Sequence, residues 1–189
     1  MNENNSIHET ALVINCTLGE NVTIGPFCFI TDTVIGDNVV IEGNVRIEKS
    51  ILKNDIQILW GAIMRESSLE NGCIIGCEVK KSHLWTQNKA KHPWTSIISA
   101  NTGKNVNFWG GCKCANYDGH GKGTFVFGDD VFIGCNSVIS VKSNQTTTIG
   151  TGTKIGANVH LSCDVGKHSL VYLDRETGKT TIREWYYQN

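Results

Sequence analysis

The chain has little proline, no dominant charge sign and no long apolar run, and each absence excludes a class of protein. It has 189 residues, with 17 Lys and Arg against 18 Asp and Glu. This balance argues against a protein built on a field of one sign, such as a nucleic-acid coat. No apolar run approaches the ~18 residues of a membrane-spanning helix. The 20 Gly occur with only 2 Pro and without a Gly-X-Y period, which excludes a collagen-like chain and indicates many tight turns.

The N-terminal ten residues lack the basic and apolar regions of a secretory signal. We therefore expect a cytoplasmic protein whose 8 Cys are reduced thiols, because disulfides persist mainly in oxidising compartments. The cysteines form no matched pair of Cys-x-x-Cys motifs, so we expect no metal site.

A six-residue repeat organises most of the chain. Each unit begins with an aliphatic or aromatic residue, often has Gly or an acidic residue second, and has a small or branched residue fifth, as in Leu18–Thr23, Ile24–Phe29, Ile35–Val40, Ile41–Arg46, Phe127–Phe132, Ile133–Val138 and Ile155–His160. This period fits neither an α-helix nor an alternating hairpin. We interpret each unit as a short strand and a turn, with the first and fifth positions inward.

Three such units would close one triangular coil of about eighteen residues, and stacked coils would share one apolar core. Gly at the second position is expected to supply turn conformations that side chains resist. The sequence therefore predicts an all-β fold, a parallel β-helix built from hexapeptide repeats over residues 12–166. Residues 1–11 are expected to form a flexible segment, and residues 167–189 a tail that docks on the coil. Cys16, Cys28 and Cys112 occupy the fifth position and are expected to be buried, inert thiols.

The repeat fails in three places, which we interpret as loops: Glu78–Ile97, Ala115–Thr124 and Lys142–Thr148. The first contains four lysines and two histidines but only one acid, Glu78. Such a patch is either a solvated surface loop or a binding place for a phosphate, and composition alone leaves both interpretations open.

One family carries a similar series of residues. The series comprises Glu78-Val-Lys-Lys81, His92 twelve residues after Lys80, Asn105–Gly111, Asn116-Tyr-Asp-Gly119, Lys122 and Phe127–Gly134. It resembles the acetyltransferase domain of the bifunctional N-acetylglucosamine-1-phosphate uridyltransferase/glucosamine-1-phosphate acetyltransferase, over residues from about 12 to about 170. The resemblance implies a left-handed β-helix, acetyl-CoA as co-substrate, an amino sugar phosphate as acceptor, and a homotrimer with sites between its subunits. It implies neither a nucleic-acid nor a membrane partner.

The resemblance also implies residue roles. His92 matches the general base that takes a proton from the acceptor amine, a task that suits an imidazole near neutral pH. Glu78 matches an acid that would orient or tune this base. The substrate-binding positions are Arg65, Lys80, Asn107 and Lys122, and the positions beside acetyl-CoA are Asn116, Tyr117, Cys135 and Ala157.

Several positions depart from that family. Thr95 stands where a substrate-contacting Tyr is expected, Trp109 replaces a Gly of the cofactor strip, and Cys135 replaces a Ser. These departures leave three functions open: the N-acetyltransferase, an acetyltransferase for another sugar or a nucleotide-linked sugar (by N- or O-transfer), and a non-catalytic β-helix that serves as an assembly subunit. A zinc-dependent carbonic anhydrase of the same fold is not expected, because His92, His120 and His160 are far apart in the sequence.

Overall fold

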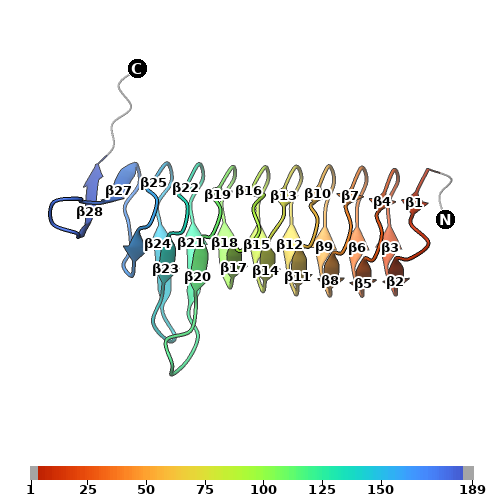
Figure 1. The fold of residues 1–189 in the computed structure, drawn as a ribbon, viewed down its shortest axis with the longest axis horizontal. Coiled ribbons are helices and arrows are strands. Elements are labelled where there is room, and N and C mark those ends of the chain that lie inside the picture. The colour runs from red at the N-terminus through yellow and green to blue at the C-terminus, as the bar shows by residue number, and fades with distance from the viewer. Residues whose placement is uncertain (1–3, 185–189) are drawn as a thin grey trace, which may run out of the picture.

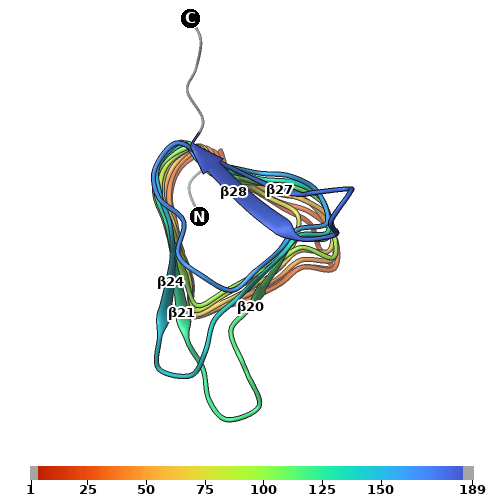
Figure 2. The same ribbon diagram turned by 90° about the vertical axis from the view of Figure 1, so that its left-hand side faces the viewer.

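The computed structural model describes residues 4–184, and in these residues it contains strands but no helix. Three sheets, here called A, B and C, form the sides of a triangular prism along which the chain winds as a left-handed parallel β-helix (Figures 1 and 2). The predicted fold class is confirmed. No helix of the described residues is long and apolar enough to cross a membrane.

Sheet A has 11 strands in the order β1 (Ser6–Ile7), β4 (Thr23–Ile24), β7 (Val40–Ile41), β10 (Gln57–Ile58), β13 (Ile74–Ile75), β16 (Lys89–Ala90), β19 (Asn107–Phe108), β22 (Phe132–Ile133), β25 (Lys154–Ile155), β27 (Ser169–Leu173) and β28 (Thr180–Glu184). Sheet B has 9 strands, β2 (Leu12–Ile14), β5 (Phe29–Thr31), β8 (Arg46–Glu48), β11 (Ile63–Arg65), β14 (Glu78–Lys80), β17 (Ser96–Ile98), β20 (Lys113–Ala115), β23 (Val138–Ser140) and β26 (His160–Leu161). Sheet C has 8 strands, β3 (Thr17–Leu18), β6 (Val34–Ile35), β9 (Ile51–Leu52), β12 (Ser68–Leu69), β15 (His83–Leu84), β18 (Ala100–Thr102), β21 (Thr124–Phe127) and β24 (Thr146–Ile149).

The first coils have 17 residues rather than the expected eighteen, as the strand register and the side chain-to-backbone hydrogen bonds between neighbouring coils show. The missing residue is in the turn from sheet B to sheet C, where one residue with positive φ is followed directly by Cys16 in the first coil and by Ser or Thr in the next coils. Lys49 (φ 48°) and Glu66 (φ 49°) are examples. The buried hydroxyls stack: Ser50 Oγ accepts the Ser67 N–H at 3.3 Å, and Ser67 Oγ donates to the Arg65 carbonyl at 2.8 Å. These bonds satisfy backbone groups that a tight buried turn would otherwise leave unpaired.

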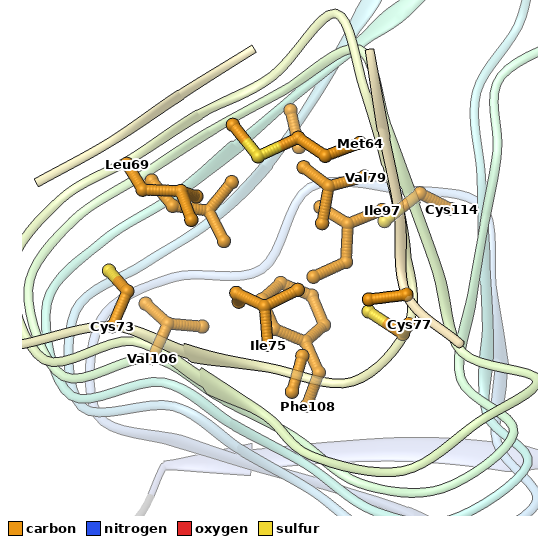
Figure 3. Close-up of a cluster of buried hydrophobic side chains, with 14 of the residues drawn as sticks. Met64, Leu69, Cys73, Ile75, Cys77, Val79, Ile97, Val106, Phe108 and Cys114 are labelled. Atoms are coloured by element: carbon orange, nitrogen blue, oxygen red, sulfur yellow. The ribbon is translucent and has the colours of Figure 1, made fainter. Parts of the chain in front are cut away.

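The first and fifth positions of the repeat point inward as predicted. Val22 and Val39 are fully buried, and Ile24 and Ile41 are no more than 2% exposed. Figure 3 shows this interior in the middle of the prism, where side chains from all three sheets meet. Burial of aliphatic side chains from every coil is therefore the main source of stability.

Gly is needed at the second position for a different reason from the one expected. Gly25 does not have positive φ, but a Cβ there would lie 2.3 Å from the carbonyl oxygen of Glu42 in the next coil. Close approach of the stacked coil therefore excludes a side chain. Positive φ occurs instead at the fourth position, for example at Asn21 (φ 55°) and Asn38 (φ 55°), and Asn tolerates this region better than most residues.

The interpretation of Glu78–Ile97 as a loop is wrong, because this segment forms β14, β15, β16 and the start of β17. Its inward residues Val79, Leu84, Ala90 and Ile97 are fully buried. The repeat loses its phase there because the turn from β13 to β14 has only two residues, Gly76 and Cys77. This turn shortens the coil, and contacts between neighbouring coils on sheet C span 15 residues there.

The other two breaks are loops in whole or in part. Residues 116–123 project from the prism after β20, and residues 142–145 lie beside them (Figures 1 and 2). Residues 146–148 of the third break instead belong to β24.

The two ends of the described chain take part in sheet A. β1 already pairs with β4 before residue 12, and β27 continues the parallel sheet beyond residue 166 before β28 folds back antiparallel. The aromatic residues at 185–187 are outside the described residues.

The cysteines at inward positions have the surroundings of structural thiols. Cys28 and Cys112 are buried, whereas Cys16, in the first coil, is half-buried. Burial raises the pKa of Cys112 to about 11, which leaves little thiolate at neutral pH.

Candidate functional site

His92 lies at the corner between sheets A and B, in the turn formed by residues 91–95, which we call the His92 corner. This turn has five residues, whereas the next equivalent turn, 109–112, has four and the preceding one, Gly76–Cys77, has two. The His92 side chain is exposed, and within residues 4–184 neither of its ring nitrogens has a hydrogen-bond partner. Its ring centroid is 6.0 Å from that of Trp109, which is 5.8 Å from Phe132. The imidazole therefore lies beside an aromatic neighbour, and both of its ring nitrogens are available to a ligand.

Two hydrogen bonds fix the shape of the corner. The buried Thr95 hydroxyl donates to the Trp109 carbonyl at 3.1 Å. Lys113 Nζ donates to the Trp94 carbonyl. Trp94 has positive φ (61°) and is 80% exposed. Thr95 therefore supports the corner from inside and does not face the surface, although it occupies the position of a substrate-contacting Tyr in the resembling family.

Two hollows meet at His92. One, of about 460 Å³, is lined by His92, Pro93, Trp94, Gly110, Gly111 and Asn136. The other, of about 290 Å³, is on the sheet A side and is lined by Lys89, Lys91, His92, Asn107, Phe108 and Trp109. Gly110 keeps the first hollow open, because a Cβ there would lie 3.4 Å from His92 Cβ.

A polar strip on sheet B runs up to the His92 corner. Arg65 and Lys80 are paired neighbours on β11 and β14, and Glu78 is two residues before Lys80 on the same face. Ser96, four residues after His92, donates its hydroxyl to Glu78 Oε2 at 3.0 Å. Arg65 Nε is buried, and within the described residues it has no hydrogen-bond partner. An uncompensated buried N–H next to a lysine is suited to an anion.

The projecting loop at residues 116–123 carries three more candidates at the far edge of sheet B. Asn116 Nδ2 donates to Ser99 Oγ at 3.0 Å. Tyr117 is 61% exposed, and its hydroxyl donates to the Gly119 carbonyl at 3.0 Å. Lys122 pairs with Tyr117 through an isolated antiparallel bridge. The loop that carries these residues projects from the prism (Figure 2).

One chain therefore brings only part of the predicted site together. His92, Cys135 and Ala157 lie in turns of the same corner, with the turn 109–112 between the first two, and Asn107 lines the hollow on the sheet A side. Arg65, Glu78 and Lys80 form the strip on sheet B, with Asn116, Tyr117 and Lys122 beyond it. Residues missed by the sequence reasoning are Ser96, Lys113 and Asn136. The strand register could have found the first two, since Glu78, Ser96 and Lys113 are successive partners.

Comparison with known proteins agrees with the repeat seen in the structure. Residues 15–49 match the family described as bacterial transferase hexapeptide (six repeats). Over 148 residues, 76% of the chain, the sequence is 38% identical to the bifunctional protein GlmU of Baumannia cicadellinicola subsp. Homalodisca coagulata. The chain is a hexapeptide-repeat protein. The resemblance inferred from the motifs is confirmed, although the match spans only 31% of the length of that relative.

Solved structures show that the fold of this hexapeptide-repeat protein is shared. A UDP-N-acetylglucosamine acyltransferase from Campylobacter jejuni has a TM-score of 0.67 at 20% identity, covering 94% of this chain and 74% of that one. The Arabidopsis UDP-N-acetylglucosamine acyltransferase has a TM-score of 0.55 at 17% identity, covering 95% and 74%. At these identities the likeness concerns the fold alone.

Proposed function

We propose that the protein is an acetyl-CoA-dependent N-acetyltransferase that acts on an amino sugar phosphate similar to glucosamine 1-phosphate. The observation that carries the proposal is the exposed His92, with no hydrogen-bond partner among residues 4–184, at the meeting point of two hollows. Its position in a region 38% identical to a GlmU protein supports the chemistry.

In this mechanism His92 accepts a proton from the acceptor amine as the nitrogen attacks the thioester carbonyl carbon. A C–N bond forms and a tetrahedral oxyanion develops. The oxyanion collapses with cleavage of the C–S bond, and His92 returns its proton to the departing thiolate. No covalent enzyme intermediate is needed. Asn107 would donate a hydrogen bond to the developing negative charge.

The remaining candidates supply binding. Arg65 and Lys80 would hold the phosphate on sheet B, since the unpartnered Arg65 Nε can donate to a phosphate oxygen. Glu78, fixed by Ser96, would orient the amine or His92. The open corner at Gly110, Cys135 and Ala157 would accept the extended arm of the acyl donor.

A homotrimer would complete this site. The loop of residues 116–123, which carries Tyr117 and Lys122, projects from the edge between sheets B and C, whereas His92 lies at the corner between sheets A and B (Figure 2). In a closed ring of three copies, the loop of one subunit would reach the corner of the next. Light scattering would test this assembly.

The direct test incubates purified protein with acetyl-CoA and a panel of amino sugars with and without phosphate, and identifies the products by mass. His92→Gln should lower kcat by about 10²- to 10⁴-fold, the usual contribution of a general base. His8→Gln is the matched control, because His8 is an exposed histidine at the same corner in the first coil, and it should leave kcat unchanged.

The panel also separates the alternatives. Acetylation of a hydroxyl or of a nucleotide-linked sugar would replace the acceptor but keep the base. No turnover of any acceptor, together with no thermal shift from acetyl-CoA, would identify a non-catalytic assembly protein. Turnover by His92→Gln at the wild-type rate would reject the mechanism.

A further inference from the structure

A third hollow lies on sheet C, beside the edge that sheet C shares with sheet B. It measures about 740 Å³, which is larger than either hollow at His92. Its lining includes Ile51, Ser68, His83, Asn101 and Val126. None of the residues assigned to acetyl transfer lines it, so its chemistry is independent of the proposed function.

The five lining residues form one row across sheet C. They are successive partners on β9, β12, β15, β18 and β21, in the order Ile51, Ser68, His83, Asn101, Val126. Neighbouring strands lie about 4.8 Å apart, so each side chain is in reach of the next. Ile51 is 44% exposed and Val126 is 38% exposed. Three polar side chains are therefore flanked by apolar surface on both sides.

Ser68 and His83 are joined by a short hydrogen bond. Ser68 Oγ and His83 Nδ1 are 2.5 Å apart, and both residues are half-buried. The imidazole is perpendicular to the Trp85 ring, with 5.9 Å between the ring centroids. A serine hydroxyl becomes a nucleophile when an adjacent base within hydrogen-bond reach takes its proton. The pair meets this requirement without movement of either side chain.

Asn101 and Lys49 supply two further groups. Within residues 4–184 the Asn101 amide has no hydrogen-bond partner, and Asn101 follows His83 in the row. Its oxygen can accept the Nε2–H of His83 in the tautomer whose Nδ1 receives the serine proton. Lys49 lines the same hollow, and among the described residues it forms no ion pair. Its charge is available to stabilise an oxyanion.

We propose that Ser68 and His83, positioned by Asn101, form a second catalytic site that hydrolyses carboxylic esters with a short apolar acyl group. The apolar side chains of Ile51 and Val126, at the two ends of the row, provide the surface for such a group.

The reaction has two steps. Ser68 Oγ attacks the ester carbonyl carbon while His83 takes the serine proton, and a tetrahedral oxyanion forms. The oxyanion collapses with cleavage of the C–O bond to the alcohol, which leaves with the proton from His83. In the second step a water molecule gives a proton to His83 and attacks the acyl-serine. The carboxylic acid departs, and Ser68 regains its proton from His83.

Labelling with a fluorophosphonate tests the nucleophile in the purified full chain. An activated serine forms a P–O bond with the reagent and displaces fluoride. Peptide mass spectrometry should find the label on Ser68, and Ser68→Ala should abolish it. His83→Gln should slow labelling by about 10²-fold or more, as expected for loss of a general base. Hydrolysis of p-nitrophenyl butyrate should fall in both variants, with thermal unfolding as the check that they fold.

Two substitutions test whether Asn101 acts through His83. Asn101→Leu removes the acceptor for the Nε2–H and should slow labelling by about tenfold or more, because the base loses its orienting partner. Asn101→Asp keeps an acceptor oxygen and should restore labelling. Labelling of Asn101→Leu at the wild-type rate would contradict the positioning role.

Ser140 and His160 on sheet B are the matched control. Ser140 Oγ and His160 Nε2 are 3.2 Å apart on the adjacent strands β23 and β26, but neither residue lines this hollow. Ser140→Ala and His160→Gln should leave labelling and ester hydrolysis unchanged.

The inference is overturned if Ser68 is not labelled, if Ser140 is labelled at the same rate, or if His83→Gln reacts like the wild type. Acetyl transfer by a chain whose Ser68 does not react would keep the proposed function and reject this site. Labelling of Ser68 in a chain that transfers no acetyl group would keep this site and reject the proposed function.

Discussion

The coils of residues 6–75 and those of residues 76–155 share one core but differ in regularity. In the first region equivalent side chains bond to each other at a spacing of 17 residues, as from Asn21 to Asn38 at 3.0 Å and from Asn38 to Asp55 at 3.1 Å. In the second, contacts between neighbouring coils span 15, 18, 25 or 22 residues. Apart from Arg65 in the first region and Ala157 just beyond the second, every candidate residue for acetyl transfer is in the second region.

This difference in coil length shows how a repeat protein can form a candidate functional site without changing its core. When every coil has the same length, equivalent residues stack on one another and the outer surface of the β-helix stays regular. Compared with the four-residue turn 59–62, the turn Gly76–Cys77 is two residues shorter and the His92 corner is one residue longer. Equivalent turns of neighbouring coils therefore no longer stack regularly. Adding residues after Ala115 produces the projecting loop. Most inward positions stay apolar, so most of the variation is in the corners and costs the core little.

The largest expected stability effect tests whether the core is common to both regions. Ile47→Ala in the regular coils and Ile97→Ala in the irregular coils each remove a fully buried side chain. Each should lower the free energy of unfolding by about 2–5 kcal/mol in urea denaturation. Ile97→Ala should also lower kcat of the folded enzyme, because its neighbour Ser96 holds Glu78. An equal loss of kcat in Ile47→Ala would contradict the assignment of the candidate site to the irregular coils.

Two glycines, one in the regular coils and one in the irregular coils, test the same comparison with a smaller expected effect on stability. Gly25→Ala should destabilise the fold by about 1–3 kcal/mol, because the new Cβ meets the Glu42 carbonyl of the next coil at 2.3 Å. Gly110→Ala should change stability by less than about 0.5 kcal/mol, since its Cβ meets only His92 at ordinary contact distance. It should instead raise the KM for the acyl donor, because the methyl group enters the hollow beside His92.

Thermal or urea unfolding and steady-state kinetics on both glycine variants measure the two effects. If Gly110→Ala destabilises as much as Gly25→Ala, the hollow is packed space rather than a binding place.

The sequence predicts the regular coils and their buried residues better than it predicts the candidate site. Val22, Ile24 and their equivalents recur at fixed positions, so fold class and inward residues follow from the period. The period does not reveal the strands in Glu78–Ile97, because the short turn Gly76–Cys77 shifts the phase of the six-residue repeat. The inward residues of this segment also include the small Ala90 and the polar Asn88. Asn88 is fully buried, and its amide accepts the Val106 N–H at 2.6 Å and donates to Trp85, Thr102 and Gly103. A single buried residue with this set of partners leaves no periodic signal.

The candidate site does not follow from the six-residue period for a related reason. Which residues meet depends on how many residues each coil contains, and a difference of one moves a side chain from the surface to the interior. Thr95 illustrates this dependence: its position in the motif suggested a surface role, but it points inward and bonds to the Trp109 carbonyl. Lys113 was not singled out, yet it is next to Ser96 in the register and reaches Trp94.

The smallest effect concerns the projecting loop, which is the feature of the irregular region farthest from the core. Asp118 links it to the neighbouring loop: its carboxylate accepts the Ser143 N–H at 2.8 Å and hydroxyl at 2.7 Å, and the N–H groups of His120 and Gly121 at 2.9 and 3.0 Å. These donors, Ser143 first, hold the pKa of Asp118 well below its usual value. The ionised form is therefore the one that orders the loop.

Because the folded pKa is depressed, the ordering is fully present above the ordinary Asp value of about 4 and is lost as the pH falls through the folded value. Hydrogen exchange of residues 116–124 should therefore be constant in protection between pH 7 and 5. Asp118→Asn should reduce that protection about two- to fivefold, the size of a surface electrostatic effect, and should leave exchange in β7 and β10 unchanged. Loss of protection in those strands would show that the loop also stabilises the regular coils. The stability of the two regions would then not be independent.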